Sequence, residues 1–348
     1  MEEKDVSLRL YIEICSACNL QCKYCFEEGY TPRFINEQNL YEFLTKCSPN
    51  ITDVVITGGE PMLHPSFYEI CQFIADFASV VVTTNGTLLN VSQIKKLLRD
   101  YPSIKLQFSL DAVEQSFVDT VRGPGVYSKV IDAINSLHEF HSQIGISSTL
   151  TRQTPQMIDK IYSFAKDNHI TCYFPSLLPY GALCANWSEV MPSFDEYIKS
   201  EKKLVELIAN DSAGIISSNK IDWILNRYKS SYYPNNGLID NELILKIDSS
   251  GNILCCPATD ISYSCSKISN IQSIGSFQEL LDNYRKCTDC QSVGVLSDCI
   301  ECSASKFCRS EFCGNCIHMK SNYSEINEFL CKTIRYHFSE LIDATEEG

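Results

Sequence analysis

The feature that most constrains the fold is a regular alternation of strand and helix patterns between residues 8 and 174. Short apolar runs bounded by turn residues predict strands, and the segments between them carry apolar residues at helical spacing. Six strands are expected, at residues 8–14, 53–57, 80–84, 104–110, 144–150 and 170–174. Strands separated by helices pair in parallel through right-handed crossovers. The sequence therefore predicts an α/β fold whose sheet curls into a partial (β/α)6 TIM-like barrel.

One of the expected helices begins with the pattern of a capping box, in which a serine and a glutamate three residues later exchange hydrogen bonds. Ser66 and Glu69 predict this start after the second strand. Ser193 and Glu196 are expected to start a further helix beyond the sixth strand. Both pairs therefore predict where a helix begins.

The alternation stops after the sixth strand. Residues 177–241 lack its period and are interpreted as a bridge, and residues 243–255 then predict a β-hairpin that opens a second cysteine-rich region. We expect three parts: a barrel over residues 1–176, the bridge over 177–241 and a small cysteine-rich α+β domain over 242–348.

The charge balance and hydropathy narrow the classes of partner that the protein can have. The 29 basic and 43 acidic side chains give a net charge of -14, which argues against nucleic acid as the main partner. No apolar run approaches the roughly 20 residues of a membrane span, and the first residues lack a signal-peptide core. We therefore expect a cytoplasmic protein without a membrane partner.

The chain has 19 cysteines, and a reducing compartment does not favour disulfides. Four lie between Cys15 and Cys25, and eleven lie between Cys255 and Cys331. Metal ligation at both cysteine-rich ends is the expected use. The histidines form no ligand pattern and are interpreted as ordinary surface or interface residues: His64, His138, His141, His169, His318 and His337.

The first cysteine-rich stretch contains Cys18, Cys22 and Cys25, separated by four and three residues. A cuboidal iron–sulfur cluster normally takes four thiolates. Three thiols in one compact loop would therefore leave one iron open to another ligand. The spacing suits a cluster better than a disulfide framework.

These three cysteines, with the aromatic Tyr24 before the last of them, resemble the CX3CX2C signature of the radical S-adenosylmethionine (SAM) superfamily. The resemblance implies a 4Fe-4S cluster whose open iron chelates SAM. It implies that an electron from the cluster cleaves the sulfonium and that a 5′-deoxyadenosyl radical then removes hydrogen from a substrate. A zinc site or a chance group of cysteines is the alternative for the motif alone.

Polar or glycine-rich residues follow the next three strands, where barrel enzymes build their sites. Gly58, Gly59 and Glu60 resemble the family's GGEP motif, whose backbone and carboxylate meet the amino group of SAM, and glycine permits a close approach. The resemblance implies further cofactor-binding residues: Tyr24, Thr84, Asn85, Ser109, Asp111 and Arg122. Ser109 and Asp111 would hold the ribose. The alternatives are a turn residue for Asp111 and a solvated side chain for Arg122.

Three further cysteines, two in the barrel and Cys184 in the bridge, need a separate interpretation. Cys15 is expected to be a buried thiol at the end of the first strand, because a fourth protein ligand would close the cluster to SAM. Cys172 and Cys184 are candidate hydrogen-atom donors to a substrate radical, as in related peptide epimerases. Buried structural thiols are the alternative for both.

The second cysteine-rich region resembles a SPASM domain, the extension that carries auxiliary 4Fe-4S clusters in one branch of the superfamily. Gly251 with Cys256 fits its GX4C element. The resemblance implies an outer auxiliary cluster held by Cys299, Cys302, Cys308 and Cys331. It implies that Cys256 and Cys313 contribute to an inner auxiliary cluster. The spacing from Cys308 to Cys313 departs from the usual CX3C, so Cys316 is the alternative ligand to Cys313.

The ligand set of the inner cluster is incomplete, so one or two auxiliary clusters are expected. The remaining candidates are Cys255, Cys265, Cys287 and Cys290. Zinc is the alternative for the pair formed by Cys287 and Cys290. Auxiliary clusters would accept an electron from the substrate radical, or would shape the channel and relay electrons; the sequence leaves both open.

Similar proteins mostly modify ribosomally made peptides, by thioether or carbon–carbon crosslinks or by epimerisation, and this is the first functional hypothesis. The alternatives are a small-molecule dehydrogenase of the aminosugar alcohol type and a non-catalytic iron–sulfur or zinc protein. A flavodoxin- or ferredoxin-type reductant is expected. The first strand begins near Leu8, so leader-peptide recognition is expected from a separate protein or from the bridge.

Overall fold

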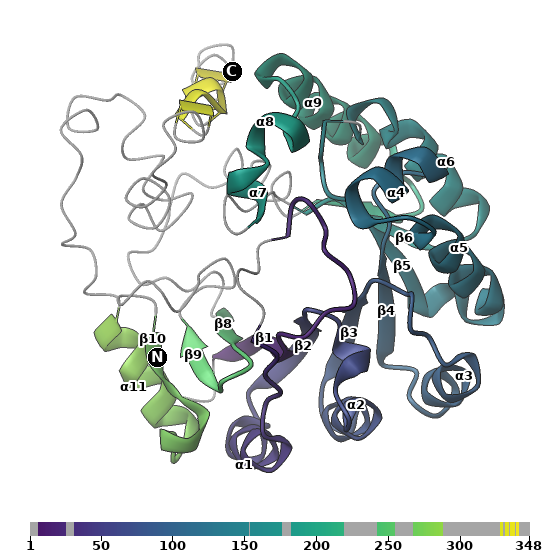
Figure 1. The fold of residues 1–348 in the computed structure, drawn as a ribbon. Helices are drawn as coiled ribbons and strands as arrows, with labels where there is room; N and C mark the ends of the chain where they lie inside the picture. Colours follow the sequence, from purple (N-terminus) through teal and green to yellow (C-terminus); the bar gives the residue numbers. More distant parts are fainter. Residues whose placement is uncertain are drawn as a thin grey trace.

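The computed structural model describes residues 6–25, 31–152, 154–175, 182–218, 242–254 and 267–287. It also describes helical positions near the C-terminus, which we call the C-terminal helical segment: 328, 329, 331–333, 335–337, 339 and 340. These residues form one curved sheet with helices along its outer side (Figure 1).

The six predicted strands are confirmed, and they pair in parallel in chain order. They are β1 (Ser7–Cys15), β2 (Ile51–Gly58), β3 (Ser79–Thr84), β4 (Ile104–Ser109), β5 (Ile144–Ser147) and β6 (Thr171–Tyr173). A short strand, β7 (Ile216–Ser217), adds to β6 in the same direction. Because the strands are parallel, their carboxyl ends meet at one edge of the sheet.

The predicted hairpin is also confirmed. β8 (Glu242–Ile247) pairs with β9 (Asn252–Leu254) in antiparallel fashion, and β10 (Lys267–Asn270) extends β9. β8 in addition runs parallel to β1, so the hairpin continues the barrel sheet. The sequence shows no sign of this pairing, and a separate second domain from residue 242 stays a prediction.

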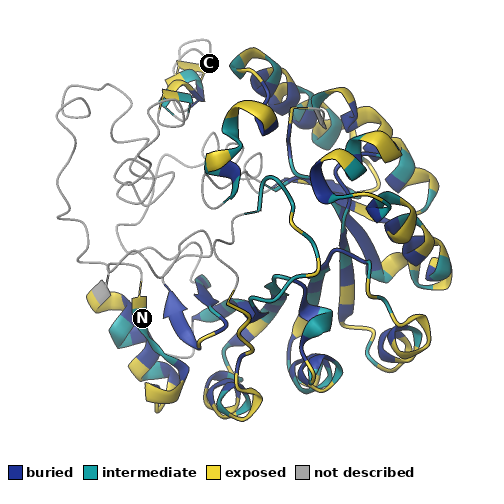
Figure 2. Cartoon of the chain, viewed as in Figure 1, coloured by how far each residue is buried: buried dark blue, intermediate teal, exposed yellow. Residues whose placement is uncertain are grey.

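The helices of the repeating units cover the outer face of the sheet. They are α1 (Glu37–Cys47), α2 (Phe67–Ala75), α3 (Val91–Asp100), α4 (Gln115–Arg122), α5 (Val126–Ser136) and α6 (Ile158–Asp167). Alternate residues of β1, from Leu8 to Ile14, are fully buried and belong to the same apolar core as Leu40 and Phe43 of α1. The sides of the helices that face the sheet are buried and their outer sides are exposed (Figure 2). Apolar burial on this face holds the barrel together.

The opposite face of β1 is polar. Arg9 and Tyr11 are partly exposed there, and Glu13 is buried. The Glu13 carboxylate lies 2.5 Å from the ammonium of Lys246 on β8. Buried charges need such a partner, so this ion pair helps to fix β8 beside β1.

Both predicted helix starts are confirmed. Ser193 and Glu196 begin α9 (Phe194–Asn210) and form a capping box there. α2 begins directly after Ser66, but the predicted capping box is wrong, because Ser66 makes no side-chain cap. Its ψ of 30° departs from the extended backbone that brings an N-cap hydroxyl to the first turn, and its N–H donates to His64 Nδ1 instead.

The remaining described helices are α7 (Ala182–Ala185), α8 (Trp187–Val190), α11 (Phe277–Cys287) and four 3-10 turns: Pro61–Leu63, His138–Gln143, Thr154–Gln156 and Ile271–Ser273. None of the described helices combines the length and apolar character of a membrane span.

A candidate cofactor site at the carboxyl ends of the strands

The segment that follows β1, residues 16–25, is here called the cysteine loop. It crosses the mouth of the barrel toward α7 (Figure 1). Cys18, Cys22 and Cys25 are all partly exposed in it. The Leu20 N–H donates to Cys18 Sγ at 3.4 Å, and the Cys25 N–H donates to the Cys22 carbonyl at 3.1 Å. The turn therefore holds the three thiols on one compact stretch.

The thiols lie close enough to affect one another. Burial raises the pKa of Cys22 to about 11. The Arg122 guanidinium opposes the rise, and the charges of Asp111, Cys25 and Cys18 add to it. Burial also raises the pKa of Cys18, with a contribution from Cys25. Among the described residues, however, no three potential ligands converge on a point where one metal ion could sit. A cluster does not need such a point, because its thiolates bind separate irons.

Gly58 and Gly59 bring the end of β2 against the cysteine loop. A Cβ on Gly59 would lie 2.2 Å from the Ala17 carbonyl oxygen, and one on Gly58 would lie 2.1 Å from that of Cys15. Gly58 also has a φ of 138°, which L side chains rarely adopt. The Gly59 N–H donates to the Cys15 carbonyl at 2.9 Å. The glycines are thus required by this backbone packing, a reason that the motif alone did not reveal.

Glu60 ties the ends of β2 and β3 together. Its side chain is fully buried, and Oε1 accepts from Thr84 Oγ1 at 2.8 Å while Oε2 accepts from the Asn85 N–H at 2.7 Å. The Met62 N–H also donates to Oε1, at 3.1 Å. Burial raises the pKa of Glu60, and these hydrogen bonds oppose the rise. Both oxygens of the Glu60 carboxylate therefore already accept hydrogen bonds from protein groups.

Asn85 extends this network to the cysteine loop. Its Nδ2 donates to Asn19 Oδ1 at 2.9 Å and lies 3.9 Å from Cys18 Sγ. The N–H of Thr87 in turn donates to Asn85 Oδ1 at 2.9 Å. The end of β3 thus supports the Cys18 side of the loop.

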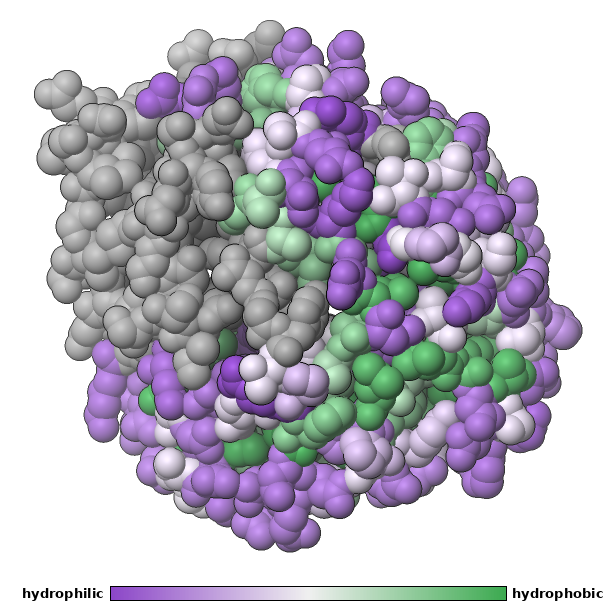
Figure 3. All heavy atoms as spheres, in the orientation of Figure 1, coloured by the Kyte–Doolittle hydropathy of each residue, from purple (hydrophilic) through white to green (hydrophobic). Residues whose placement is uncertain are grey.

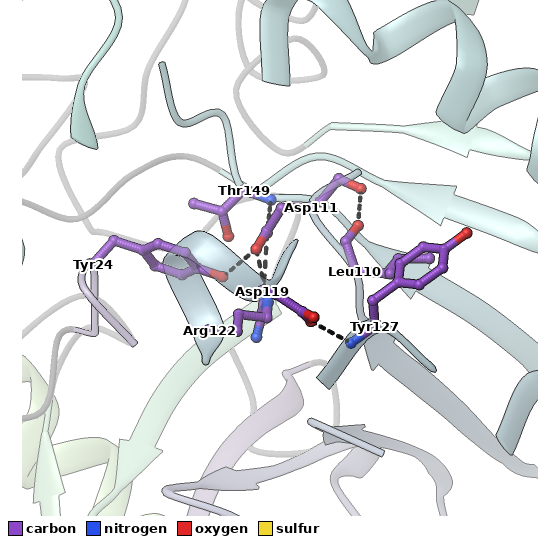
Figure 4. A network of polar contacts seen from close by, with 8 residues as sticks. Tyr24, Leu110, Asp111, Asp119, Arg122, Tyr127 and Thr149 are labelled. Atoms are coloured by element: carbon purple, nitrogen blue, oxygen red, sulfur yellow. Dashed lines mark hydrogen bonds and ion pairs between the residues drawn. The ribbon is translucent and has the colours of Figure 1, made fainter. Parts of the chain in front are cut away.

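Asp111, just after β4, is the centre of a second network, which Figure 4 shows. Its Oδ2 accepts from Arg122 Nε at 2.7 Å and from the Tyr24 hydroxyl at 2.6 Å. Its Oδ1 accepts from Arg122 Nη2 at 3.1 Å and from the Thr149 N–H at 3.0 Å. Asp111 and Arg122 are buried, so the solvated alternative for Arg122 is wrong. The bidentate pair fixes a positive charge beside Cys22.

The helix that carries Arg122 is itself held in place. Asp119 on α4 accepts the N–H groups of Gly125 and Tyr127, both at 3.0 Å, where α5 begins (Figure 4). The Arg122 guanidinium carbon lies 5.3 Å from the centre of the Tyr24 ring, over its face. The Lys23 N–H donates to the Val121 carbonyl at 3.0 Å. The end of α4 therefore supports the Cys22 side of the loop.

Comparison with known proteins shows which family the barrel part of the chain is similar to. Residues 12–165, which include the cysteine loop and both networks, match the model of the radical SAM superfamily. This part of the chain is similar to the radical SAM superfamily.

Relatives and solved structures are similar to this chain over most of its length. Mycofactocin maturase MftC of Mycobacterium tuberculosis (strain ATCC 25618 / H37Rv) is 23% identical over 326 residues, which span 87% of this chain and 80% of MftC. SuiB of Streptococcus suis bound to S-adenosylmethionine has a TM-score of 0.69 at 16% identity, over 87% of this chain and 72% of SuiB. Native anSMEcpe with bound AdoMet has a TM-score of 0.69 at 20% identity, over 97% of this chain and 99% of anSMEcpe. The two structures establish a shared fold.

The residues present fit the cofactors of a radical SAM protein. Three neighbouring thiols at the barrel mouth provide soft ligands for iron. A fixed guanidinium lies beside them, which suits a site that gathers thiolate charge and a SAM carboxylate. The contacts to SAM of the predicted residues stay predictions, and Ser109 lies at the end of β4 on the same edge of the sheet.

The other predicted cysteines of the barrel lie in different environments. Cys15 is fully buried as predicted, donates to the Glu60 carbonyl at 3.2 Å and has a pKa that burial raises to about 12. Cys172 is fully buried in β6, and burial raises its pKa to about 12 as well. Cys184 lies on α7 and is partly exposed. Of the two candidate hydrogen donors, only Cys184 has an accessible surface.

Most of the expected auxiliary-cluster ligands lie outside the described residues: Cys255, Cys256, Cys265, Cys290, Cys299, Cys302, Cys308, Cys313 and Cys316. Cys287 is the last residue of α11, and Cys331 lies in the C-terminal helical segment, partly exposed. The auxiliary clusters therefore stay a prediction.

Two histidines were wrongly interpreted as surface or interface residues. His64 is buried, and its Nε2 lies 3.1 Å from the Ile35 carbonyl. His337 is buried too, with Nε2 2.9 Å from Oε2 of Glu201 on α9. Their partners lie 29 and 136 residues away in sequence, so a local pattern could not reveal either pair.

Proposed function

We propose that this chain is a radical SAM enzyme that removes hydrogen from a ribosomally synthesised peptide and thereby introduces a thioether or carbon–carbon crosslink or an epimerised residue. The observation that carries the proposal is the cysteine loop, held between the Glu60 and Asp111 networks at the carboxyl ends of the strands. MftC is named a maturase, and SuiB has been solved bound to its precursor peptide SuiA. These relationships favour a peptide over a small molecule.

When a 4Fe-4S cluster and SAM are bound by Cys18, Cys22 and Cys25 and the adjoining strand ends, they supply the 5′-deoxyadenosyl radical. The protein's own contribution is positional. The Glu60 side chain joins the ends of β2 and β3, and Asn85 connects them to the cysteine loop. The Asp111 carboxylate keeps the Arg122 guanidinium fixed and buried. A buried, preorganised cation acts more strongly on neighbouring negative charge than a solvated one.

The mouth of the barrel also offers apolar surface. Leu88 and Val91, which follow the end of β3, are 40% and 38% exposed. In the described part of the view in Figure 3, apolar residues lie near the middle and polar residues lie along the right and lower edges. Such a surface suits the side chains of a peptide. We include Cys184 in the proposal as a hydrogen-atom donor, because the residue is partly exposed and lies on α7, whose first residue bonds the cysteine loop.

The proposal extends to one or two auxiliary 4Fe-4S clusters in the second cysteine-rich region, to a flavodoxin- or ferredoxin-type reductant, to a separate leader-binding protein and to the cytoplasm. The iron and sulfide content of anaerobically purified protein tests the clusters. Iron for one cluster only would contradict auxiliary clusters, and iron for two would leave a single auxiliary cluster.

Reductive formation of 5′-deoxyadenosine from SAM tests the radical chemistry. Cys22→Ala should abolish it, because the loop then has two thiols, whereas Cys15→Ala should retain it, because the Cys15 thiol is buried and bonded to a carbonyl. Equal loss in both variants would contradict the assignment of the ligands.

Mass spectrometry of candidate precursor peptides after anaerobic incubation tests the substrate. Loss of two hydrogens indicates a crosslink, and deuterium uptake in heavy water at otherwise unchanged mass indicates epimerisation. For an epimerase, Cys184→Ala should leave the peptide radical without its donor and yield quenched by-products; an unchanged product would remove Cys184 from the proposal.

A further inference from the structure

The segment formed by α7 and α8, residues 182–190, holds the cysteine loop from the side opposite to α4. The Ala182 N–H donates to the Cys25 carbonyl at 2.8 Å. The Asn186 side chain donates through Nδ2 to the Lys23 carbonyl at 3.0 Å and to the Ala182 carbonyl at 2.9 Å. Asn186 therefore links the first residue of α7 to the loop through one amide group.

A charged contact accompanies these bonds. Lys23 forms an ion pair with Glu189 on α8, but their side chains are 35% and 57% exposed. An ion pair with this exposure contributes little to a fixed geometry. The main-chain and amide hydrogen bonds are thus the contacts that place the loop.

The same segment packs against the C-terminal helical segment. Phe329 lies edge-on to three aromatic rings, with centroid distances of 5.4 Å to Trp187 of α8, 5.3 Å to Tyr197 and 6.1 Å to Phe194 of α9. Edge-on aromatic pairs of this kind stabilise a specific arrangement as well as burying area. The Trp187 ring therefore belongs to the surface on which the C-terminal helical segment docks.

The docking has a second fixed point. His337 and Glu201 meet at 2.9 Å with side chains that are 8% and 5% exposed. This buried contact lies two helical turns beyond Phe329, so the C-terminal helical segment contacts the barrel at two separated positions. Its orientation against α9 is thereby defined.

Asn186 and Trp187 are consecutive, and they face the two partners: one bonds the cysteine loop and the other contacts Phe329. We propose that Asn186 is a positioning residue for the cysteine loop, and that Trp187 makes its position depend on docking of the C-terminal helical segment. Cys331, two residues after Phe329, is a predicted ligand of an auxiliary cluster. The C-terminal helical segment would therefore respond to binding of that cluster, and it contacts residues 182–190, which support the cysteine loop. The inference uses the loop as the radical-cluster site and does not depend on a peptide substrate.

Hydrogen–deuterium exchange of the anaerobically purified full-length protein tests this coupling, because it reports local opening of each segment without requiring turnover. In Asn186→Ala and in Phe329→Ala, exchange in peptides covering residues 18–25 should rise severalfold, while peptides from β2 to β4 stay unchanged. Phe329→Leu, which keeps apolar volume but not the ring, should give an intermediate rise and covers the case in which the alanine variant does not fold. Phe140→Ala, a partly buried aromatic of the 3-10 turn before β5, is the matched control and should leave the loop unchanged.

A spectroscopic readout separates positioning from general stability. The electron paramagnetic resonance signal of the reduced cluster should shift less on addition of SAM in Asn186→Ala than in the wild type, and the KM for SAM should rise more than kcat falls. Two outcomes would overturn the inference: exchange in residues 328–340 rises in Phe329→Ala without any rise in residues 18–25, or the rise extends to β2, β3 and β4. A wild-type protein that forms no 5′-deoxyadenosine would instead contradict the proposed function. The exchange result would still decide whether Asn186 and Phe329 position the cysteine loop.

Discussion

Glu60 and Asp111 occupy similar places and are held in different ways. Both follow the carboxyl end of a strand beside the cysteine loop, and their exposed fractions are 0% and 3%. Glu60 accepts hydrogen bonds from neutral groups only, the Thr84 hydroxyl and two backbone N–H groups. Asp111 accepts a bidentate pair from Arg122, together with the Tyr24 hydroxyl and a backbone N–H.

The difference in hydrogen-bond partners indicates that the two carboxylates have different structural roles. Glu60 joins neighbouring strand ends and so builds the surface on which Cys18 rests. Asp111 holds a buried cation beside Cys22 and reaches the cysteine loop directly through Tyr24. A carboxylate with neutral partners can lose its charge without leaving another charge unpaired, whereas one paired with arginine cannot. The following substitutions test this contrast.

Asp111→Asn should have the largest effect. It removes the counter-charge of the buried Arg122, and breaking a buried pair in this way costs about 3–5 kcal/mol of unfolding free energy. Urea denaturation of the anaerobic protein measures the change. In the double variant Asp111→Leu with Arg122→Met, both charges are absent, so its loss should be smaller than that of the single variant. A single variant within about 1 kcal/mol of the wild type would show that Arg122 does not depend on Asp111.

Glu60→Gln should cost less, about 1–3 kcal/mol. The amide oxygen can still accept from Thr84 and Met62, but the amide nitrogen would face the Asn85 N–H, so two donors would meet. The same substitution at the exposed Glu69 on α2 is the matched control and should stay within about 0.5 kcal/mol of the wild type. If Glu60→Gln proved more harmful than Asp111→Asn, the contrast between the two carboxylates would be reversed.

The sequence was informative where the signal is local. Apolar runs of strand length and helical stripes between them identified the six parallel strands, because each pattern reflects the two sides of a single element. The cysteine spacing indicated the resemblance to a family for a similar reason, since the three cysteines of the motif lie within eight residues. The capping pairs show the limit: Ser193 and Glu196 form their box, but the backbone at Ser66 turns another way.

The rest depends on contacts between residues that are distant in sequence. Tyr24 meets Asp111 across 87 positions, and β8 pairs with β1 after a separation of more than 200 residues. Neither the burial of Arg122 nor the backbone packing of Gly59 is visible without those contacts. The predicted SAM-binding residues do gather at one edge of the sheet, but several of their polar atoms are already bonded to one another. A motif thus identifies the site and does not separate residues that contact the ligand from those that build the site.

The pH dependence of Glu60 provides the most subtle test of the contrast. Burial raises its pKa in the folded protein above the unfolded value of about 4.3. Between the two pKa values the native state binds more protons than the unfolded state, so this group's contribution to stability is fully present below the unfolded pKa and is lost as pH rises through the folded pKa. The glutamine in Glu60→Gln cannot titrate.

The difference in unfolding free energy between wild type and Glu60→Gln should therefore shrink as pH rises from about 4.5 to 8. The decrease should be smaller than the free-energy cost of the substitution itself. Denaturation curves of both proteins across this range measure the difference, in which the titration of every other carboxylate cancels. A difference that grows with pH would mean that the three hydrogen bonds outweigh burial, and Glu60 would then resemble an ordinary stabilised carboxylate.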